Sequence, residues 1–300
     1  MNETVTFEPT TALVTSLLKE QFPTLAKLPV RGVRNSGWDN RTFHLGDELL
    51  VRLPSAAAYA DNIYKEQRWL PWLRDRLPIA VPEVVGCGKP SERFPWPFSI
   101  HRWLPGELAS TLTPDQLPAF AESLAAALTA LQQLPTTGGP VPGLRPGSRG
   151  RPLEGMDAAV DQALDRLLHE NRLGQGKRDR LRAVWHHARS QPSTTPGQWL
   201  HGDVAAGNLL VTGDRLSALI DFSGLAVGDP ASDTVIAWTL FDAPSRAVFS
   251  AGLGLDDGCW ARGMGWALWK ALIVEARLID TNALEKAAAP RVLAALGDAL

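Results

Sequence analysis

Cysteine is scarce in this chain of 300 residues, which contains only Cys87 and Cys259. The two lie far apart and lack the spacing of metal-ligand pairs, so we expect neither a disulfide framework nor a cysteine-based metal site. We interpret both as small, buried apolar residues. Their low number is typical of a reducing compartment, and we expect a cytoplasmic location.

Signals for membranes are also missing. No uninterrupted apolar run reaches the ~20 residues that a membrane-spanning helix needs. The first residues, 1–4, have neither a positively charged start nor an apolar stretch, so they do not resemble a signal peptide. We therefore expect no membrane partner.

The chain has no strong excess of charge. Its formal net charge is −2, and basic and acidic residues are mixed along it, so there is no electrostatic reason to expect a nucleic-acid partner. The composition, 45% apolar and 21% charged, is that of a globular protein. At roughly 150 residues per domain, the length suggests two domains.

The pattern of apolar residues changes near residue 103. The first part predicts helices over 10–22 and 56–76, the second bent or ended early by Pro71, and strands over 42–45, 49–53, 81–85 and 98–103. The second part predicts helices over 114–134, 157–173, 177–190, 232–241 and 259–278, with a Gly/Pro-rich loop over 136–155. We expect an α+β fold with a β-rich lobe, 1–103, and a larger α-helical lobe, 104–300.

The most specific motif is His201-Gly202-Asp203, followed by Asn208 five residues after the Asp. Protein kinases carry His-Arg-Asp with an Asn at the same spacing, where the Asp accepts a proton and the Asn binds a metal ion. Gly202 stands in place of the Arg. The apolar residues 209–211 predict a buried strand that holds Asn208.

A second segment ends in a carboxylate. Residues 218–220 predict an apolar strand, and Asp221 follows it. A turn at residues 213–214 would bring Asn208 and Asp221 to the same end of a hairpin. Their oxygens are the ligands that Mg²⁺ prefers. Asp221 alone is an ordinary loop acid, but the ordered set with Asp203 and Asn208 favours a magnesium and nucleotide site.

Together these segments resemble the aminoglycoside phosphotransferase family, a branch of the protein-kinase-like fold that includes macrolide, choline and homoserine kinases. The family's His-Gly-Asp-x-x-x-x-Asn loop and Ile-Asp-Phe/Trp motif are matched by residues 201–208 and 220–222. Its Gly-Asp-Pro-x-x-Asp motif is matched by residues 228–233. The resemblance extends from about residue 30 to about residue 270 and implies the two-lobe fold.

The resemblance implies a role for each matched residue. Asp203 would accept the proton of the substrate hydroxyl, and Asn208 and Asp221 would hold Mg²⁺ against the phosphates of ATP or GTP. His201 would orient the loop through hydrogen bonds. Asp229 would support the site structurally.

Asp229 precedes Pro230, and either Asp229 or Asp233 could cap the helix that follows. Contact with the substrate is the alternative for both acids.

In the first lobe, the resemblance places a turn over the nucleotide phosphates at residues 35–40. Gly37 would let the backbone approach phosphate and Ser36 could donate a hydrogen bond, although an ordinary hairpin turn would look the same. The stretch 100–103, with Ile100 and Arg102, would be the linker whose backbone meets the adenine edge.

Arg52 occupies the position at which kinases carry a phosphate-binding Lys, which is a departure from the pattern. Because Arg is always charged and can bind two oxygens at once, it could still clamp the phosphates. We expect Glu66 to be its partner. An exposed strand arginine is the alternative.

The acceptor is less constrained. Residues 221–300 contain ten acidic and six basic residues, an excess of four that favours a cationic aminoglycoside, although a solvated face gives the same excess. Four tryptophans of this part could line a sugar or macrolide site or could pack in the core. They are Trp238, Trp260, Trp266 and Trp269. The segment after Asp221 is too short for a protein kinase's activation loop, so we expect a small-molecule substrate.

The alternatives are a metabolic kinase of the same fold, acting on a sugar, amino alcohol, fructosamine or macrolide, and a catalytically silent nucleotide-binding module. The departure at Arg52 keeps the second alternative open. Both a monomer and a homodimer are compatible with the sequence.

Overall fold

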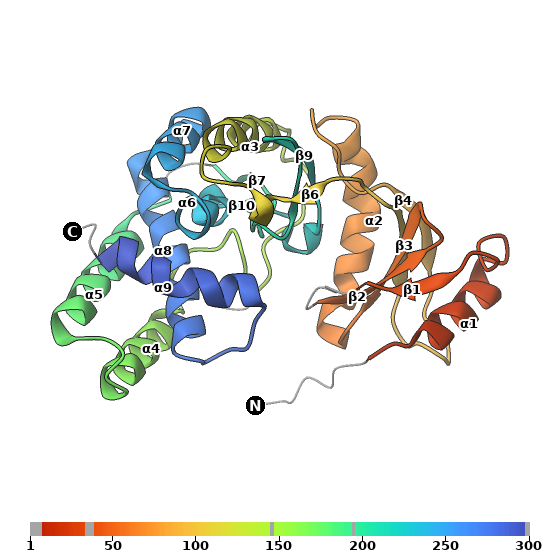
Figure 1. Ribbon diagram of the computed structural model, residues 1–300, viewed down its shortest axis with the longest axis horizontal. Coiled ribbons are helices and arrows are strands. Elements are labelled where there is room, and N and C mark those ends of the chain that lie inside the picture. Colours follow the sequence, from red (N-terminus) through yellow and green to blue (C-terminus); the bar gives the residue numbers. More distant parts are fainter. Residues whose placement is uncertain (1–7, 34–38, 145–146, 194–195, 298–300) are drawn as a thin grey trace. The chain divides into compact units, whose positions relative to one another are not determined.

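The computed structural model describes residues 8–33, 39–144, 147–193 and 196–297. The chain divides into two compact units, Met1–Pro105 and Gly106–Leu300. The first unit is built around a sheet and the second mostly from helices (Figure 1). The predicted α+β fold is therefore confirmed. In the described part of the chain, no helix is both long and apolar enough to span a membrane.

The N-terminal unit is an antiparallel five-stranded sheet in the order β1-β2-β3-β5-β4. Its strands are β1 (Val30–Gly32), β2 (Asn40–Leu45), β3 (Leu49–Pro54), β4 (Val84–Gly88) and β5 (Phe98–Arg102). Its helical segments are α1 (Thr11–Gln21), the short 3₁₀ helix η1 (Ala57–Tyr59) and α2 (Ala60–Arg74). Thr10 begins α1 as predicted, since its hydroxyl accepts the N–H of Leu13 at 3.2 Å.

The alternation of side chains along β3 decides which residues enter the core. Leu49, Val51 and Leu53 belong to one apolar cluster with the buried side of α1. Because successive strand residues point to opposite faces, Arg52 points to the other face, where it meets Glu66 of α2. The register of the sheet thus places a cation against a helix.

Helix α2 contains Pro71 and ends at Arg74, two residues before the predicted end; the proline lies in its last turn, where few backbone hydrogen bonds are affected. One local expectation for this unit was wrong. Cys87 is exposed rather than buried, since it lies on β4 at the edge of the sheet. Cys259 is buried, as predicted.

The C-terminal unit combines helices with two small sheets. Its helices are α3 (Leu117–Gln132), α4 (Asp157–His169), α5 (Gln175–Ser190), α6 (Ile236–Thr239), α7 (Ala243–Leu253), α8 (Asp257–Glu275) and α9 (Ala283–Gly297). One sheet has the order β6-β8-β9, from β6 (Glu107–Leu108), β8 (Leu209–Thr212) and β9 (Arg215–Leu219); the other pairs β7 (Gln198–Leu200) with β10 (Ala226–Gly228). Short 3₁₀ segments are η2 (Ala109–Thr111), η3 (Phe222–Gly224) and η4 (Pro230–Val235).

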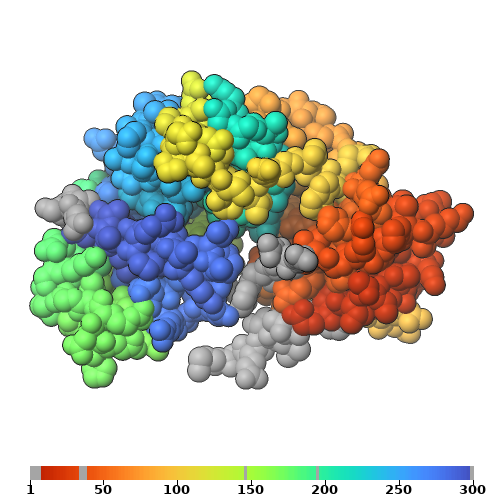
Figure 2. Space-filling view, viewed as in Figure 1, coloured from red at the N-terminus to blue at the C-terminus, as the bar shows by residue number. Residues whose placement is uncertain are grey.

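Helix α8 is the centre of this unit, packed against α4, α5, α9 and η4 (Figure 1). The α4, α5 and α9 segments form one continuous face of the unit in Figure 2. The predicted helix over 232–241 is instead η4 followed by the short α6. This segment packs closely on α8, because a Cβ at Gly263 would lie only 1.9 Å from the Thr234 hydroxyl.

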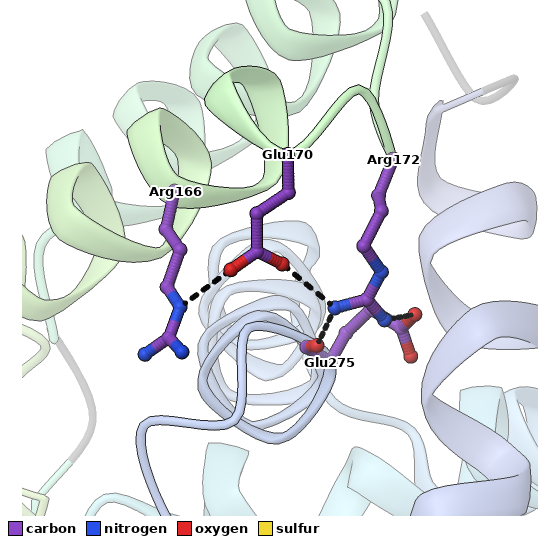
Figure 3. Close-up of polar contacts among 4 residues, drawn as sticks. All are labelled: Arg166, Glu170, Arg172 and Glu275. Atoms are coloured by element: carbon purple, nitrogen blue, oxygen red, sulfur yellow. Dashed lines mark hydrogen bonds and ion pairs between the residues drawn. The ribbon is translucent and has the colours of Figure 1, made fainter.

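A network of charges joins the ends of α4 and α8 (Figure 3). Glu170 accepts from Arg166 at 3.0 Å and from Arg172 at 3.4 Å. Arg172 also donates to the backbone carbonyl of Glu275 at 2.7 Å and pairs with the Glu275 carboxylate. The Arg172 guanidinium thus donates to a carbonyl at the C-terminal end of α8, where no partner within the helix is available. The network therefore fixes this end of the central helix.

Candidate active site

The hairpin of β8 and β9 brings Asn208 and Asp221 together. Leu209 pairs with Leu219, and one step further the Ile220 N–H donates to the Asn208 carbonyl at 3.0 Å. Asp221 is the next residue, in the left-handed region at φ 62°. Asp is among the few residues that adopt this conformation readily. The two predicted metal ligands therefore lie at the same end of one hairpin.

Asp203 is held by Asn208. The amide nitrogen of Asn208 donates to Asp203 Oδ2 at 2.7 Å and to the Asp203 carbonyl at 3.1 Å. The loop between them is closed by the Ala205 N–H on the Asp203 carbonyl and the Asn208 N–H on the Ala205 carbonyl. For Asp203 Oδ1, the described residues supply no hydrogen bond that competes with an incoming hydroxyl.

His201 connects the candidate catalytic loop, residues 201–208, to the strand before Asp221. Its Nδ1 accepts the backbone N–H of Asp203 at 3.2 Å, so Nε2 carries the proton and donates to the Ile220 carbonyl at 3.1 Å. Complete burial of the ring lowers the pKa of His201. The imidazole is therefore neutral and links two backbone segments through hydrogen bonds. Its ring also contacts Phe222.

Gly202 is required by a contact between two backbone segments. It has a φ of +84°, and a Cβ there would lie 2.2 Å from the carbonyl oxygen of Gly224. A Cβ on Gly224 would in turn lie 2.9 Å from the Gly202 carbonyl carbon. No side chain fits between these segments, which accounts for Gly where protein kinases have Arg. The loop carrying Asp203 is thereby packed directly on the segment that follows Asp221.

Asp233 fixes the same loop from the other side. Its carboxylate accepts the N–H of His201 at 2.7 Å and the N–H of Gly202 at 2.8 Å, and it is buried. Burial raises the pKa of Asp233, and the backbone N–H groups of Gly202 and His201 that donate to its carboxylate oppose that rise. Asp233 was expected to be structural, with a helix cap as one option and substrate contact as the alternative; in the structure it accepts two backbone N–H groups of the 201–208 loop.

Asp229 forms the cap of η4 and a buried ion pair. Its Oδ1 accepts the Ala231 N–H at 3.1 Å, and its two oxygens meet Nε and Nη2 of Arg262 at 2.6 and 3.1 Å. Arg262 also donates to the Pro192 carbonyl at 2.8 Å. Sequence reasoning missed Arg262 because it lies 33 residues away, on α8; the only available signal was an arginine within an apolar helix.

The surroundings of Asp203 favour its action as a base. Burial raises the pKa of the Asp203 carboxyl; the charge of Arg149 opposes the rise, and that of Asp221 adds to it. A raised pKa brings a carboxylate closer to that of an effective general base. The charge of Glu285 also raises the pKa of Asp203, and that of Lys270 lowers it. These two residues form an ion pair at 3.0 Å.

The donor set at the hairpin end fits a magnesium ion. Since the Asn208 nitrogen is engaged by Asp203, the amide oxygen is the atom that remains for a metal, beside the Asp221 carboxylate. Over the described residues, no cluster of three or more His, Cys, Asp or Glu is placed to hold a metal. Mg²⁺ is commonly bound through one or two protein groups plus phosphates and water, so the two ligands suffice.

In the N-terminal unit, Arg52 and Glu66 meet as the sequence suggested. Nη1 of Arg52 lies 2.9 and 2.7 Å from the two Glu66 oxygens. Both side chains are buried, so Arg52 is not an exposed strand arginine. A buried charge pair with both oxygens on one nitrogen fixes where the guanidinium lies.

The other residues predicted to bind the nucleotide are Ser36, Gly37, Ile100 and Arg102. Ser36 and Gly37 lie outside the described residues. Ile100 lies inside β5 with neighbours Val51 and Gly86 on both sides, so its backbone groups face other strands rather than a base edge. The Arg102 N–H donates to the Glu83 carbonyl at 2.9 Å and its exposed side chain pairs with Glu83. The backbone groups of Ile100 and the N–H of Arg102 are therefore used within the N-terminal unit.

Comparisons with known proteins place these features in context. A family model described as "Phosphotransferase enzyme family" matches residues 32–272. No curated protein sequence matches.

Solved structures share the fold at low identity. The GDP and kanamycin complex of APH(2")-IIia is 20% identical, with a TM-score of 0.71 over 94% of this chain and 97% of that one. The GDP complex of wild-type aminoglycoside 2'-phosphotransferase-IIIa is 18% identical, with a TM-score of 0.72 over 96% and 99%. Macrolide 2'-phosphotransferase type I is 22% identical, with a TM-score of 0.60 over 99% and 100%.

Proposed function

Because the chain belongs to the phosphotransferase enzyme family, we propose that it transfers the γ-phosphate of ATP or GTP to a hydroxyl group of a small molecule. The observation that carries this proposal is the arrangement of Asp203, Asn208 and Asp221. One Asp203 oxygen is held by Asn208 at 2.7 Å, which leaves the other to meet the acceptor. The N-terminal unit binds the nucleotide, and the C-terminal unit carries out the transfer.

Each residue has one task in this mechanism. The Asp203 carboxylate accepts the proton of the acceptor hydroxyl while the hydroxyl oxygen attacks the γ-phosphorus. Asn208 and Asp221 would hold Mg²⁺, which when bound neutralises phosphate charge. Arg52, fixed by Glu66, binds the α- and β-phosphates. Phosphoryl transfer depends mainly on positioning and charge stabilisation, so this small set is sufficient.

The acceptor that the sequence favours is an aminoglycoside-type antibiotic. Support comes from the acidic excess after residue 221 and from the relative whose structure contains kanamycin. However, many of these acids already have partners within the fold: Asp229, Glu275, Asp280 and Glu285 are in ion pairs, and Asp242 and Asp256 cap helices. That observation favours a second candidate, a less cationic hydroxyl compound such as a macrolide.

A turnover screen tests the proposal. Purified protein is incubated with Mg²⁺ and ATP or GTP against aminoglycosides, macrolides and small metabolites, and nucleoside diphosphate release is measured. We expect Asp203→Ala to lower kcat by about 10²–10⁴-fold, the usual contribution of a general base. Asp214→Asn, an exposed acid in the β8–β9 turn, serves as the matched control with unchanged turnover.

Two results would contradict this function. Turnover that survives Asp203→Ala would exclude Asp203 as the base. Nucleotide binding without transfer to any acceptor or to water would indicate a silent nucleotide-binding module instead.

A further inference from the structure

Arg149 is fixed beside the catalytic loop by the backbone of the next residue. Gly150, at φ +81°, accepts the Asp229 N–H on its carbonyl at 2.9 Å. A Cβ at Gly150 would lie 2.7 Å from the side chain of Leu200, which immediately precedes His201. Gly150 therefore contacts the end of β7, which immediately precedes His201, and the residue that follows β10. The side chain of Arg149 leaves the chain at that point.

The side chain of Arg149 lies over two indole rings. Its guanidinium carbon is 4.8 Å from the ring centre of Trp266 and 5.8 Å from that of Trp269, so cation–π contacts hold it in place. Nη1 is buried and has no hydrogen-bond partner among the described residues. A buried charged donor without an acceptor is costly, and a guanidinium is suited to bind an anion such as phosphate.

The neighbours of Arg149 in the chain lie beside the segment that carries the proposed base. Gly150 packs against Leu200, three residues before Asp203, and its carbonyl accepts the N–H of Asp229. These backbone contacts place Arg149 next to the segment that leads into Asp203, where the acceptor hydroxyl would lose its proton.

The catalytic loop itself supplies no cation for the reaction. The four residues between Asp203 and Asn208 are Val204, Ala205, Ala206 and Gly207. During transfer, negative charge is spread over the oxygens of the γ-phosphoryl group, and an arginine placed there lowers the barrier. The reaction proposed above brings such an anion to Asp203.

We propose that Arg149 is a catalytic residue that donates hydrogen bonds to the oxygens of the γ-phosphoryl group during transfer, an assignment that rests on the proposed function. The acceptor oxygen bonds to the γ-phosphorus while the bond from that phosphorus to the β,γ-bridging oxygen breaks. The departing nucleoside diphosphate keeps the electron pair of that bond, and the proton of the acceptor goes to Asp203. Arg149 remains protonated throughout.

The test uses hydrolysis of ATP or GTP in the presence of Mg²⁺, with water as acceptor, and also any acceptor found in the screen. Arg149→Met retains an apolar side chain over the two indoles but removes the charge, and Arg149→Lys retains the charge. Arg151→Ala is the matched control, because Arg151 lies in the same loop and, among the described residues, its side chain forms one long hydrogen bond, to the Gly143 carbonyl at 3.4 Å. Melting temperature is measured for every variant.

We expect Arg149→Met to lower kcat for hydrolysis by about 10²–10³-fold, the loss seen when one donor to developing charge is removed. The nucleotide KM should stay within about threefold, because the interaction forms only in the transition state. Arg149→Lys should retain more activity than Arg149→Met. Free guanidinium at a non-denaturing concentration should restore part of the kcat of Arg149→Met, and Arg151→Ala should match the wild type.

Other results overturn the assignment. Unchanged hydrolysis in Arg149→Met, with a raised acceptor KM, would mean that Arg149 binds an anionic acceptor. Lost hydrolysis without guanidinium rescue, together with a lowered melting temperature, would mean that it only docks the loop on α8. A wild type that hydrolyses neither nucleotide and phosphorylates no acceptor would instead remove the proposed function itself.

Discussion

In the C-terminal unit, the loop that carries the proposed base is held largely through its main-chain atoms, whereas in the N-terminal unit the proposed phosphate clamp lies in a side-chain ion pair. The loop with Asp203 packs its main chain on Gly224 and donates two N–H groups to Asp233, so the position of the base depends on main-chain atoms. Arg52 is held by the carboxylate of Glu66. Backbone contacts tolerate almost no substitution, but a side-chain pair can be rebuilt from other residues of the same charge.

This difference explains how Arg can stand where kinases carry Lys. The Arg52–Glu66 pair brings two carboxylate oxygens to one nitrogen, Nη1, which is a geometry that an ammonium group can also adopt. No comparable choice exists at Gly202, because a Cβ there would lie 2.2 Å from the Gly224 oxygen.

The largest expected effect tests the backbone contact. Gly202→Ala forces a side chain into the space of the Gly224 carbonyl and a φ of +84° on alanine. A displacement of the loop by about 1 Å would reduce kcat about 10²-fold, and the backbone strain alone costs about 1–3 kcal/mol. Steady-state turnover and chemical unfolding measure the two effects.

Gly213→Ala is the control for that experiment. Gly213 also has a positive φ, +64°, but a Cβ there would have no neighbour within 4 Å. The Gly213→Ala variant should be destabilised only by the backbone strain of alanine at a positive φ, and its kcat should equal that of the wild type. Equal loss of turnover in both variants would mean that the close approach of Gly202 and Gly224 is not what positions Asp203.

A smaller effect is expected when Asp233 becomes Asn. The amide presents one oxygen to two buried N–H groups, those of His201 and Gly202, so one donor faces an NH₂ group. We expect a loss of about 1–3 kcal/mol in the free energy of unfolding and a lower kcat with little change in nucleotide KM. Urea denaturation and steady-state kinetics provide both measurements.

Asp256→Asn is the matched control. Asp256 is an exposed N-cap whose side chain accepts the Cys259 N–H at 2.6 Å, and Asn caps helices as well as Asp does. Stability should therefore be almost unchanged. If Asp233→Asn were equally silent, the clamp on the catalytic loop would have to come from the glycine contact alone.

Sequence reasoning succeeded where structure is local. The turn at Gly213 and the apolar runs beside it predicted the β8–β9 hairpin, because both strands and their turn lie within a dozen residues. The pairing of Arg52 with Glu66, 14 residues apart, followed from the resemblance to kinases, in which a cation on a strand pairs with an acid on the next helix.

It failed where partners are distant or where geometry overrides propensity. Asp233 binds residues 31 and 32 positions earlier, and Asp229 pairs with Arg262 across 33 positions; no local pattern encodes these contacts. Ile100 was assigned to a linker because its strand character does not reveal that neighbours flank it on both sides. Asp233 was read as a helix cap since caps and buried clamps use the same residue type.

The smallest expected effect on turnover comes from a comparison of two buried arginine–carboxylate pairs, one in each unit. Arg262 binds the two oxygens of Asp229 through two nitrogens, Nε and Nη2, so Arg262→Lys loses a charge-assisted hydrogen bond of about 1.5–3 kcal/mol. In the N-terminal pair, both Glu66 oxygens meet Nη1 of Arg52, a contact that an ammonium group can also make, so Arg52→Lys should cost less stability and keep kcat within a few-fold of the wild type. Urea denaturation of both variants, with turnover for Arg52→Lys, makes the comparison. Equal destabilisation would show that the guanidinium of Arg52 is needed as a fork, and that the position is not interchangeable with Lys.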